Sequence, residues 1–165
     1  MKRFLLFVIY FCCLSTGFSQ SKSSIDFVIR NFGINVDGHF NTFNIETDFN
    51  NKGEIIDIKG EIKVASIKTG IESRDEHLLK ADYFEYIILE SKTINKKSDT
   101  IYEVVSNLTI KGKTKEISIK VNCDNMNNQY KITSNFELNR RDFNVGGGSL
   151  IMSNTVKINV IYYHN

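Results

Sequence analysis

Few side chains in this sequence have the types and spacing that chemistry needs. His39, His77 and His164 are metal-ligand types, but no two of them are closely spaced and no paired carboxylates accompany them. The serine-nucleophile signature GxSxG, the zinc signature HExxH and the redox signature CxxC do not occur. We therefore expect a protein that is not an enzyme and that holds neither a metal nor another cofactor.

The three cysteines do not form a disulfide framework. Cys12 and Cys13 lie in an apolar run near the amino terminus, and Cys123 lies in the polar stretch NCDNMNN, which is typical of a turn. No histidine is near Cys123 in the sequence to activate it as a nucleophile. We expect Cys123 to be a free, inert thiol or one that joins two copies of the chain in a homodimer.

The amino terminus has the three parts of a secretory signal peptide. Lys2 and Arg3 precede an unbroken apolar run over residues 4–14, and the small residues Gly17 and Ser19 occupy positions −3 and −1 of a cleavage site. A membrane-spanning helix needs about 18 or more apolar residues, and this run is shorter. The pattern therefore predicts a cleaved signal peptide over residues 1–19 and a periplasmic or secreted protein.

Removal of the signal peptide changes the charge balance. The 165-residue chain has a formal charge of +2, but without its first 19 residues it has 19 basic and 19 acidic side chains. A neutral domain offers no electrostatic footprint for phosphate backbones. We expect a single domain over residues 20–165 that has no nucleic-acid partner.

The remaining chain alternates apolar and polar residues with the period of two that is typical of half-buried strands. The alternation is clearest from Ile56 to Val64. Further strands are predicted near 25–29, 43–47, 87–94, 102–110, 117–121, 130–138 and 156–162. Short polar turns at 50–53, 111–113 and 125–128 can join neighbouring strands as antiparallel hairpins.

One stretch has a helical pattern. From about Ser73 to Phe84, apolar residues are interspersed with charged ones, and Ser73 can cap the start. A weaker helical turn is predicted near Ser66 to Ile71. About eight antiparallel strands form either a two-sheet sandwich or a closed barrel, and a barrel leaves no unpaired edge for a chain without prolines to protect. We expect an all-β, roughly eight-stranded antiparallel barrel with one short helix packed at one side.

Several short motifs follow one another along the chain. They are Ser24–Gly33 with Val36–Phe40, Ser66–Gly70, Arg74–Leu78 (RDEHL), Asp82–Glu85, Leu108–Lys115 (LTIKGKTK) and Arg141–Gly146. In order and spacing they resemble the motifs of the YceI-like family of secreted bacterial lipid or polyisoprenoid binders. The chain departs from the family after Glu85, where Tyr86–Leu89 replaces a usual Tyr-Pro pair. The resemblance implies a lipocalin-like barrel whose apolar tunnel holds one amphiphile, such as a polyisoprenoid or another long-chain lipid.

The resemblance gives the inward-facing residues of the strands and the helix a role as tunnel walls. The tunnel candidates are Ile25, Phe27, Ile29, Phe43, Ile45, Ile58, Ile62, Val64, Leu78, Tyr83, Phe84, Leu108, Ile110 and Phe136. Arg74, His77 and Arg141 are the candidates for binding a phosphate or carboxylate head group, because cationic donors form charge-assisted hydrogen bonds.

Each candidate also has a purely structural interpretation. The tunnel residues can be ordinary core, Arg74 can pair with Asp75 or Glu76, His77 can bond the helix to the barrel, and Arg141 can pair with Asp142. Composition alone does not reveal a cavity. The alternative to a lipid binder is therefore a module with a solid core whose surface contacts a membrane or an envelope protein.

Overall fold

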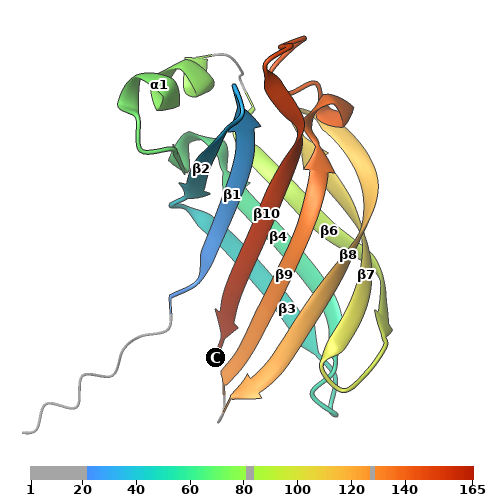
Figure 1. Cartoon of the computed structure of the whole chain (residues 1–165). Coiled ribbons are helices and arrows are strands. Elements are labelled where there is room, and N and C mark those ends of the chain that lie inside the picture. Colours follow the sequence, from blue (N-terminus) through green and yellow to red (C-terminus); the bar gives the residue numbers. More distant parts are fainter. Residues whose placement is uncertain (1–21, 81–83, 127–128) are drawn as a thin grey trace, which may run out of the picture.

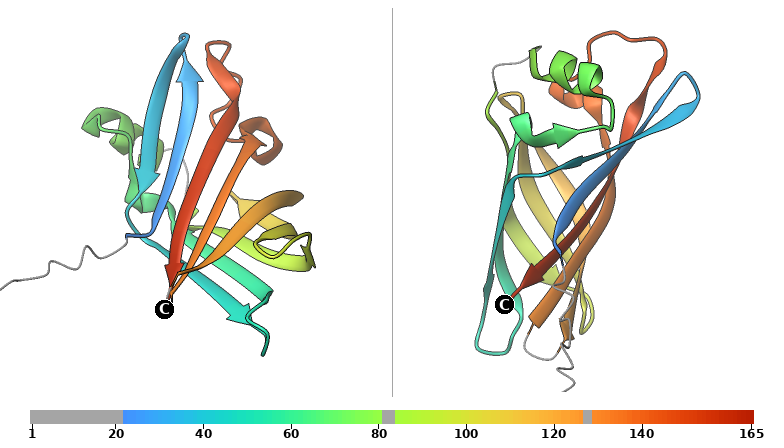
Figure 2. Two further views of the ribbon diagram at one scale, coloured as in Figure 1. Left: turned by 60° about the horizontal axis from the view of Figure 1, so that its bottom comes forward. Right: turned by 90° about the vertical axis from the view of Figure 1, so that its left-hand side faces the viewer.

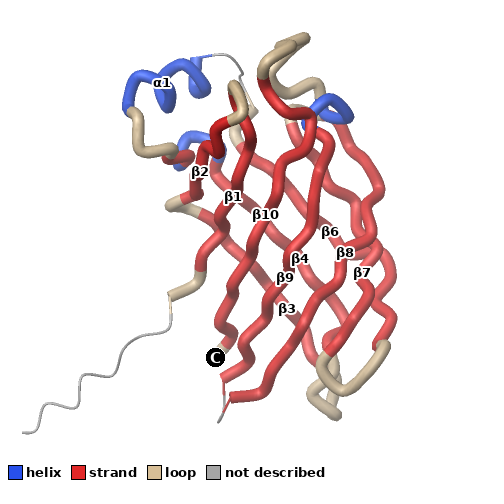
Figure 3. The backbone as a smooth tube through the Cα atoms, in the orientation of Figure 1, coloured by secondary structure: helices blue, strands red, loops and turns tan. Residues whose placement is uncertain are grey.

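The computed structural model describes residues 22–80, 84–126 and 129–165. The predicted signal peptide, residues 1–19, lies outside these residues. Figure 3 shows that most of the described chain is strand. The elements are β1 (Ser24–Asn31), β2 (Ile34–Phe40), β3 (Phe43–Phe49), β4 (Ile55–Lys63), η1 (Val64–Ser66), β5 (Ile67–Lys68), α1 (Glu72–Lys80), β6 (Tyr86–Lys96), β7 (Ile101–Ile110), β8 (Lys113–Met126), β9 (Gln129–Asn139), η2 (Arg140–Phe143) and β10 (Met152–His164).

All the strands belong to one antiparallel sheet with the order β3-β4-β6-β7-β8-β9-β10-β1-β2-β5. The chain itself joins the two ends of this order, since β3 continues β2 after two residues and β5 follows β4 after η1. Two backbone hydrogen bonds bridge these interruptions, from Asn41 N to Ser66 O (3.1 Å) and from Lys63 N to Thr42 O (3.0 Å). The sheet therefore curls into a barrel of eight continuous runs, which confirms the predicted fold (Figures 1 and 2).

The helix and the loops gather at one end of the barrel. Figures 1 and 2 place α1 at the same end as η2 and the β1–β2 hairpin tip, while the carboxyl terminus lies at the other end. The helix begins at Glu72 and is described to Lys80, close to the prediction. The weaker helical turn predicted over 66–71 is wrong. Ile67 and Lys68 form β5, because they pair with Phe40 and His39 of β2.

The predicted turn around Cys123 is also wrong. Strand β8 continues through Cys123, which pairs with Ile132 of β9. The polar side chains of Asn122 and Asp124 alternate with the buried positions of Val121 and Cys123. This segment therefore keeps the period of two while its overall composition resembles a turn.

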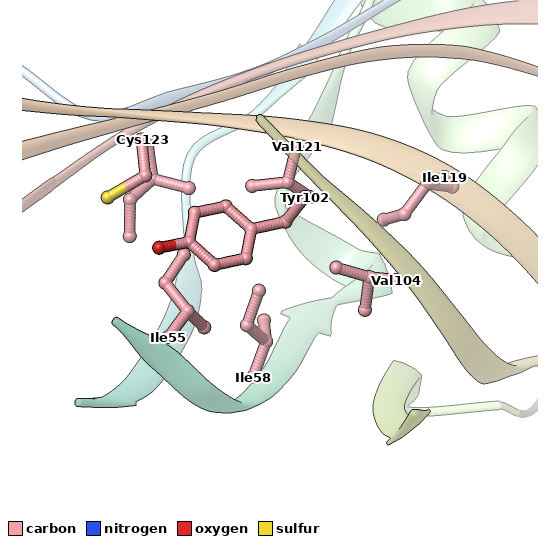
Figure 4. Packing of buried hydrophobic residues seen from close by; sticks show 8 residues of the cluster. Ile55, Ile58, Tyr102, Val104, Ile119, Val121 and Cys123 are labelled. Carbon is pink, nitrogen blue, oxygen red and sulfur yellow. The ribbon is translucent and has the colours of Figure 1, made fainter. Parts of the chain in front are cut away.

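The core contains a closely packed cluster towards the carboxyl-terminal end of the barrel. The ring of Tyr102 lies among Ile55 and Ile58 of β4 and Val121 and Cys123 of β8 (Figure 4). The remaining buried members of the cluster are Val104, Ile119 and Ile132. This cluster anchors β4, β7, β8 and β9 to one another and leaves the rest of the interior to the cavity described next.

Candidate functional site

An apolar cavity of about 140 Å³ lies inside the barrel. Every strand except β5 contributes to its wall. The lining residues are Ile25, Phe40, Ile45, Thr47, Ile58, Gly60, Ile62, Ile87, Leu89, Leu108, Ile110, Ile119, Val121, Ile132, Ser134, Phe136, Leu138, Ile158, Val160 and Tyr162. Among the described lining residues, only Thr47, Ser134 and Tyr162 bring polar side-chain atoms to this wall, so the cavity suits an apolar molecule and not a charged one.

The register of the strands explains why the wall is so uniformly apolar. Residues that face each other across neighbouring strands point to the same side of the sheet, and Ile25 pairs with Val160 while Ile45 pairs with Gly60. The alternation within each strand therefore gathers one apolar face from each run in the interior. On β9 the wall extends over four alternate residues from Ile132 to Leu138, which is roughly 20 Å of strand.

Aromatic side chains close the barrel at its carboxyl-terminal end. Phe49 stacks on Tyr130 with ring centroids 4.3 Å apart, and the ring of His164 lies 5.1 Å from that of Phe49. Tyr162, two residues before His164 on β10, lies 6.2 Å from the His164 ring and lines the cavity. The cavity therefore stops at this aromatic cluster of Phe49, Tyr130 and His164.

Arg140 holds the loop before β10 at the opposite end of the barrel. Its buried guanidinium, 3% exposed, donates hydrogen bonds to the carbonyl oxygens of five residues of the following loop and β10. The acceptors are Val145 (2.8 Å), Gly147 (3.1 Å), Ser149 (3.4 Å), Met152 (3.2 Å) and Ser153 (2.8 Å). Burial, with a smaller contribution from the charge of Arg141, lowers the pKa of Arg140. This arginine is thus occupied in holding the loop and is not available to a ligand.

A family described as the YceI-like domain matches residues 18–162. The chain belongs to the YceI-like family. This finding confirms the resemblance seen in the sequence motifs.

Known relatives agree with this membership. A UPF0312 protein of Staphylococcus aureus is 34% identical over 110 residues, which is 63% of this chain and 62% of the relative. A second, from Staphylococcus epidermidis, is 33% identical over 111 residues, which is 64% of this chain and 63% of the relative. The alignment thus spans less than two thirds of these curated relatives.

Solved structures share the YceI-like fold at low sequence identity. BcnA of Burkholderia cenocepacia has a TM-score of 0.80 at 21% identity, covering 87% of this chain and 96% of BcnA. The Campylobacter jejuni YCEI protein has a TM-score of 0.72 at 23% identity, covering 80% and 85%. A polyisoprenoid binding domain from Saccharophagus degradans has a TM-score of 0.71 at 13% identity, covering 86% and 92%.

The YceI-like barrel brings half of the tunnel candidates to the cavity. Seven of them line it, namely Ile25, Ile45, Ile58, Ile62, Leu108, Ile110 and Phe136. The other lining positions were missed, and only those on β3, β4 and β9 share a strand face with a residue that was chosen. The alternation in 117–121, 130–138 and 156–162 carries the signal that would have found most of them.

Four tunnel candidates from β1, β3 and η1 do not line the cavity. Phe27 packs against Phe40, with ring centroids 5.6 Å apart. Ile29 is two residues further from the cavity along β1, Phe43 is half-buried beside Ile62, and Val64 lies in η1. The structure therefore does not place these residues on the wall of this cavity, although Phe27 and Phe43 pair with the lining residues Ile158 and Ile62.

Phe84, Leu78 and Tyr83 were expected to close the tunnel from the helical segment. Phe84 is exposed, and its ring lies against Gly112 in the β7–β8 turn and not in the cavity. Tyr83 lies outside the described residues, and so does the side chain of Leu78.

The head-group candidates do not form one site in the described part of the YceI-like chain. The guanidinium of Arg74 donates to the hydroxyl (2.7 Å) and the carbonyl oxygen (2.5 Å) of Thr69. The hydroxyl and N–H of Thr69 in turn donate to the buried carboxylate of Asp75, so Arg74 belongs to a bridge between β5 and α1. Arg141 is exposed, and the side chain of His77 lies outside the described residues.

The cysteine in the described residues is not placed for chemistry. Cys123 is a free, buried thiol, and burial, with a smaller contribution from Asp124, raises its pKa to about 11. A disulfide between two copies through Cys123 would require the core to open.

Within residues 22–80, 84–126 and 129–165, no three His, Cys, Asp or Glu side chains come together as a metal site. No helix in these residues is long and apolar enough to span a membrane.

Proposed function

We propose that this YceI-like protein binds one amphiphilic lipid, of polyisoprenoid or fatty-acyl type, with its apolar tail inside the barrel. It carries or stores the lipid in the cell envelope and does not change it chemically. The observation that carries the proposal is the internal cavity, whose wall is hydrocarbon at nearly every position. The description of the Saccharophagus degradans neighbour as a polyisoprenoid binding domain supports the same ligand class.

The size of the cavity limits how the tail binds. At about 140 Å³ it is close to engineered apolar cavities of about 150 Å³ that hold one benzene molecule, or roughly six carbon atoms. Burial of six CH₂ groups contributes about 5 kcal/mol before the costs of ordering the ligand. A lipid tail of more than about six carbon atoms therefore needs more volume than this cavity offers. We propose that the isoleucine side chains of the wall change rotamer on binding and so enlarge the cavity.

Native mass spectrometry tests this function directly. Protein purified from its native host is weighed before and after extraction with organic solvent. We expect one lipid per chain, which extraction removes and which extracted native lipid restores. A ligand-free mass that no added lipid changes would favour the alternative, a structural or interaction module without a ligand.

Two loop tips suggest how the lipid is exchanged. Phe32 (71% exposed) and Ile34 (70%) lie at the β1–β2 tip, and Leu150 (96%) lies with Ile151 in the loop before β10. The backbone N–H of Phe32 donates to the carbonyl oxygen of Ile151 (3.1 Å), so the two tips are adjacent. We propose that this apolar tip surface, formed by Phe32, Ile34, Leu150 and Ile151, contacts a lipid surface.

The charge around the tip surface favours a membrane as the partner. Residues 30–36 and 144–155 contain one charged side chain, the exposed cation Arg30, and no carboxylate. These two segments therefore carry no negative charge that would repel anionic lipid headgroups, and their exposed apolar side chains can enter the membrane interface. The tip surface lies at the α1 end of the barrel, opposite the end closed by the aromatic cluster (Figure 1).

Vesicle co-sedimentation tests the membrane contact. The double variant Phe32→Ser with Leu150→Ser should lose co-sedimentation with vesicles of phosphatidylethanolamine and phosphatidylglycerol. The control variant Ile56→Ser with Met126→Ser changes two exposed apolar residues outside the tip surface and should bind like the unmodified protein. Equal co-sedimentation of the two variants would contradict the assignment of the tip surface as the membrane contact.

A further inference from the structure

One hydroxyl in the cavity wall lacks a hydrogen-bond partner. Thr47 is 5% exposed and lines the cavity, and its Oγ1 is buried without a partner among the described residues. A buried hydroxyl that makes no hydrogen bond is unfavourable, and a valine of the same shape would avoid that cost. The presence of threonine therefore needs an explanation, and the cavity that it faces suggests a ligand atom.

Thr47 lies towards the end of the cavity that the aromatic cluster bounds, and so does Tyr162. Tyr162 lines this region two residues before His164, and Thr47 is two residues before Phe49. Phe49 and His164 belong to the aromatic cluster that closes the barrel. Thr47 and Tyr162 thus occupy the layer of the wall directly above the closed end.

The third polar residue of the wall already has a partner. Ser134 donates its Oγ hydrogen to the carbonyl oxygen of Lys120 (2.8 Å), so it can only accept a further bond. Thr47 Oγ1 remains a free donor, and donors of this kind select a ligand that carries an acceptor. The polar part of the wall is therefore complementary to an oxygen atom.

The charges near this end favour a neutral oxygen over an anion. Burial and, to a smaller extent, the negative charge of Glu46 raise the pKa of the Tyr162 hydroxyl. The described residues that line the cavity include no Lys, Arg or His, so a phosphate or carboxylate bound beside Thr47 would find no cationic partner in the wall. The cationic head-group candidates Arg74 and Arg141 lie with α1 and η2 at the other end of the barrel.

We infer that the bound lipid places a neutral oxygen, as in an alcohol, an ether or a ketone, against Thr47 at the closed end of the cavity. This inference rests on the proposed lipid-binding function and refines it, because it sets both the head-group class and the direction of the ligand. Thr47 donates its hydrogen bond to that oxygen, and the hydrocarbon part of the lipid extends along the tunnel towards the end with α1.

Two volatile probes of equal carbon number test the inference. Geraniol carries an alcohol oxygen and myrcene is a hydrocarbon, and headspace gas chromatography measures how much of each the protein binds. We expect geraniol to bind the unmodified protein more tightly than myrcene. Thr47→Val should weaken geraniol binding about tenfold, as expected for one lost hydrogen bond, and leave myrcene binding unchanged.

Two further variants separate recognition from stability. Thr47→Ser keeps the hydroxyl and should keep the preference for geraniol. Ser106 is fully buried and its hydroxyl also lacks a partner among the described residues, but it does not line the cavity. Ser106→Ala is therefore the matched control, and it should bind both probes as the unmodified protein does. A thermal melt of each variant checks that it is folded.

The outcomes distinguish this inference from the function on which it rests. If myrcene binds but Thr47→Val leaves the geraniol preference intact, the Thr47 subsite is refuted while the lipid-binding function stands. Tighter binding of geranyl phosphate than of geraniol also refutes the subsite, because it shows an anion site. If neither geraniol nor myrcene binds, both the function and the subsite fail.

Discussion

The ring of Phe27 lies across Gly38, its cross-strand partner in the β1–β2 ladder. A Cβ atom at Gly38 would overlap the ring, with Cε1 of Phe27 only 2.7 Å away. The ring in turn packs against Phe40, which lines the cavity. A glycine on the barrel wall therefore makes room for an aromatic side chain that supports the wall of the site.

We predict that Gly38→Ala lowers the free energy of unfolding by about 1–3 kcal/mol, the usual cost of overpacking. Urea denaturation measures the change. In a Phe27→Leu background the same substitution should cost much less, because the ring that the new methyl meets is gone. Equal costs in the two backgrounds would show that Phe27 is not the obstacle.

The cavity wall yields a prediction about loading. Ile62→Arg places a charge on the lining and should reduce the lipid-loaded fraction at least tenfold, because an apolar tail does not solvate a cation. Ile62 is half-buried, so its long replacement can extend its charge towards solvent and the barrel should still fold.

Ile56→Arg is the matched control for this loading experiment. Ile56 lies on the same strand, β4, but is exposed and is not part of the cavity wall. Native mass spectrometry of the two variants reads the loaded fraction, and circular dichroism verifies the fold. A folded Ile62→Arg protein that loads as well as Ile56→Arg would contradict the assignment of the cavity as the lipid site.

Arg140 and Arg141 are neighbours with opposite roles. Arg140→Met leaves the carbonyl oxygens of five residues without their donor and should lower the free energy of unfolding by about 3 kcal/mol. Arg141→Met changes an exposed side chain and should have little effect. Guanidinium denaturation compares the two variants. Similar stabilities would show that the carbonyl cage around Arg140 contributes little.

Cys123 provides a prediction that depends on pH. Its pKa is raised from the ordinary value of 9.0 to about 11, so the folded state favours the neutral thiol. As pH rises above 9 the unfolded chain loses the proton first, and the stability that burial of the neutral thiol confers is lost between pH 9 and 11.

Two measurements check the state of this thiol. At pH 8 the native protein should react with a disulfide reagent at least about a hundredfold more slowly than the unfolded chain, because its thiolate is rarer and less accessible. Cys123→Ala should flatten the decline in unfolding free energy between pH 9 and 11. A native thiol that reacts as fast as the unfolded one would contradict the burial of Cys123.

Local patterns predicted the strands well, because the period of two survives in almost every run. The alternation from Ile56 to Val64 became β4, and only its last residue fell outside the strand, in η1. Composition misled at Cys123, where polar neighbours resemble a turn although they alternate with buried positions. It also misled at Ile67, whose strand conformation depends on pairing with Phe40, far away in the sequence.

The site was less predictable than the fold. Sequence periodicity identified the inner faces of the strands, but not which inward side chains border the cavity. Phe27 and Ile25 lie on the same face of β1, yet only Ile25 lines the cavity, because the ring of Phe27 packs over Gly38 and against Phe40. The sequence also did not show which of the adjacent arginines, Arg140 and Arg141, is exposed to a ligand, because that depends on which guanidinium points into the loop.

The sequence by itself determined the all-β class, the family and the apolar character of the interior, because these follow from local alternation and from motifs that can be read in order. The tertiary structure decided the existence and extent of the cavity, the closure of one end by Phe49, Tyr130 and His164, and the isolation of the Thr47 hydroxyl. These features arise where strands distant in the sequence meet, and a void depends on how side chains from all of them fill a shared volume.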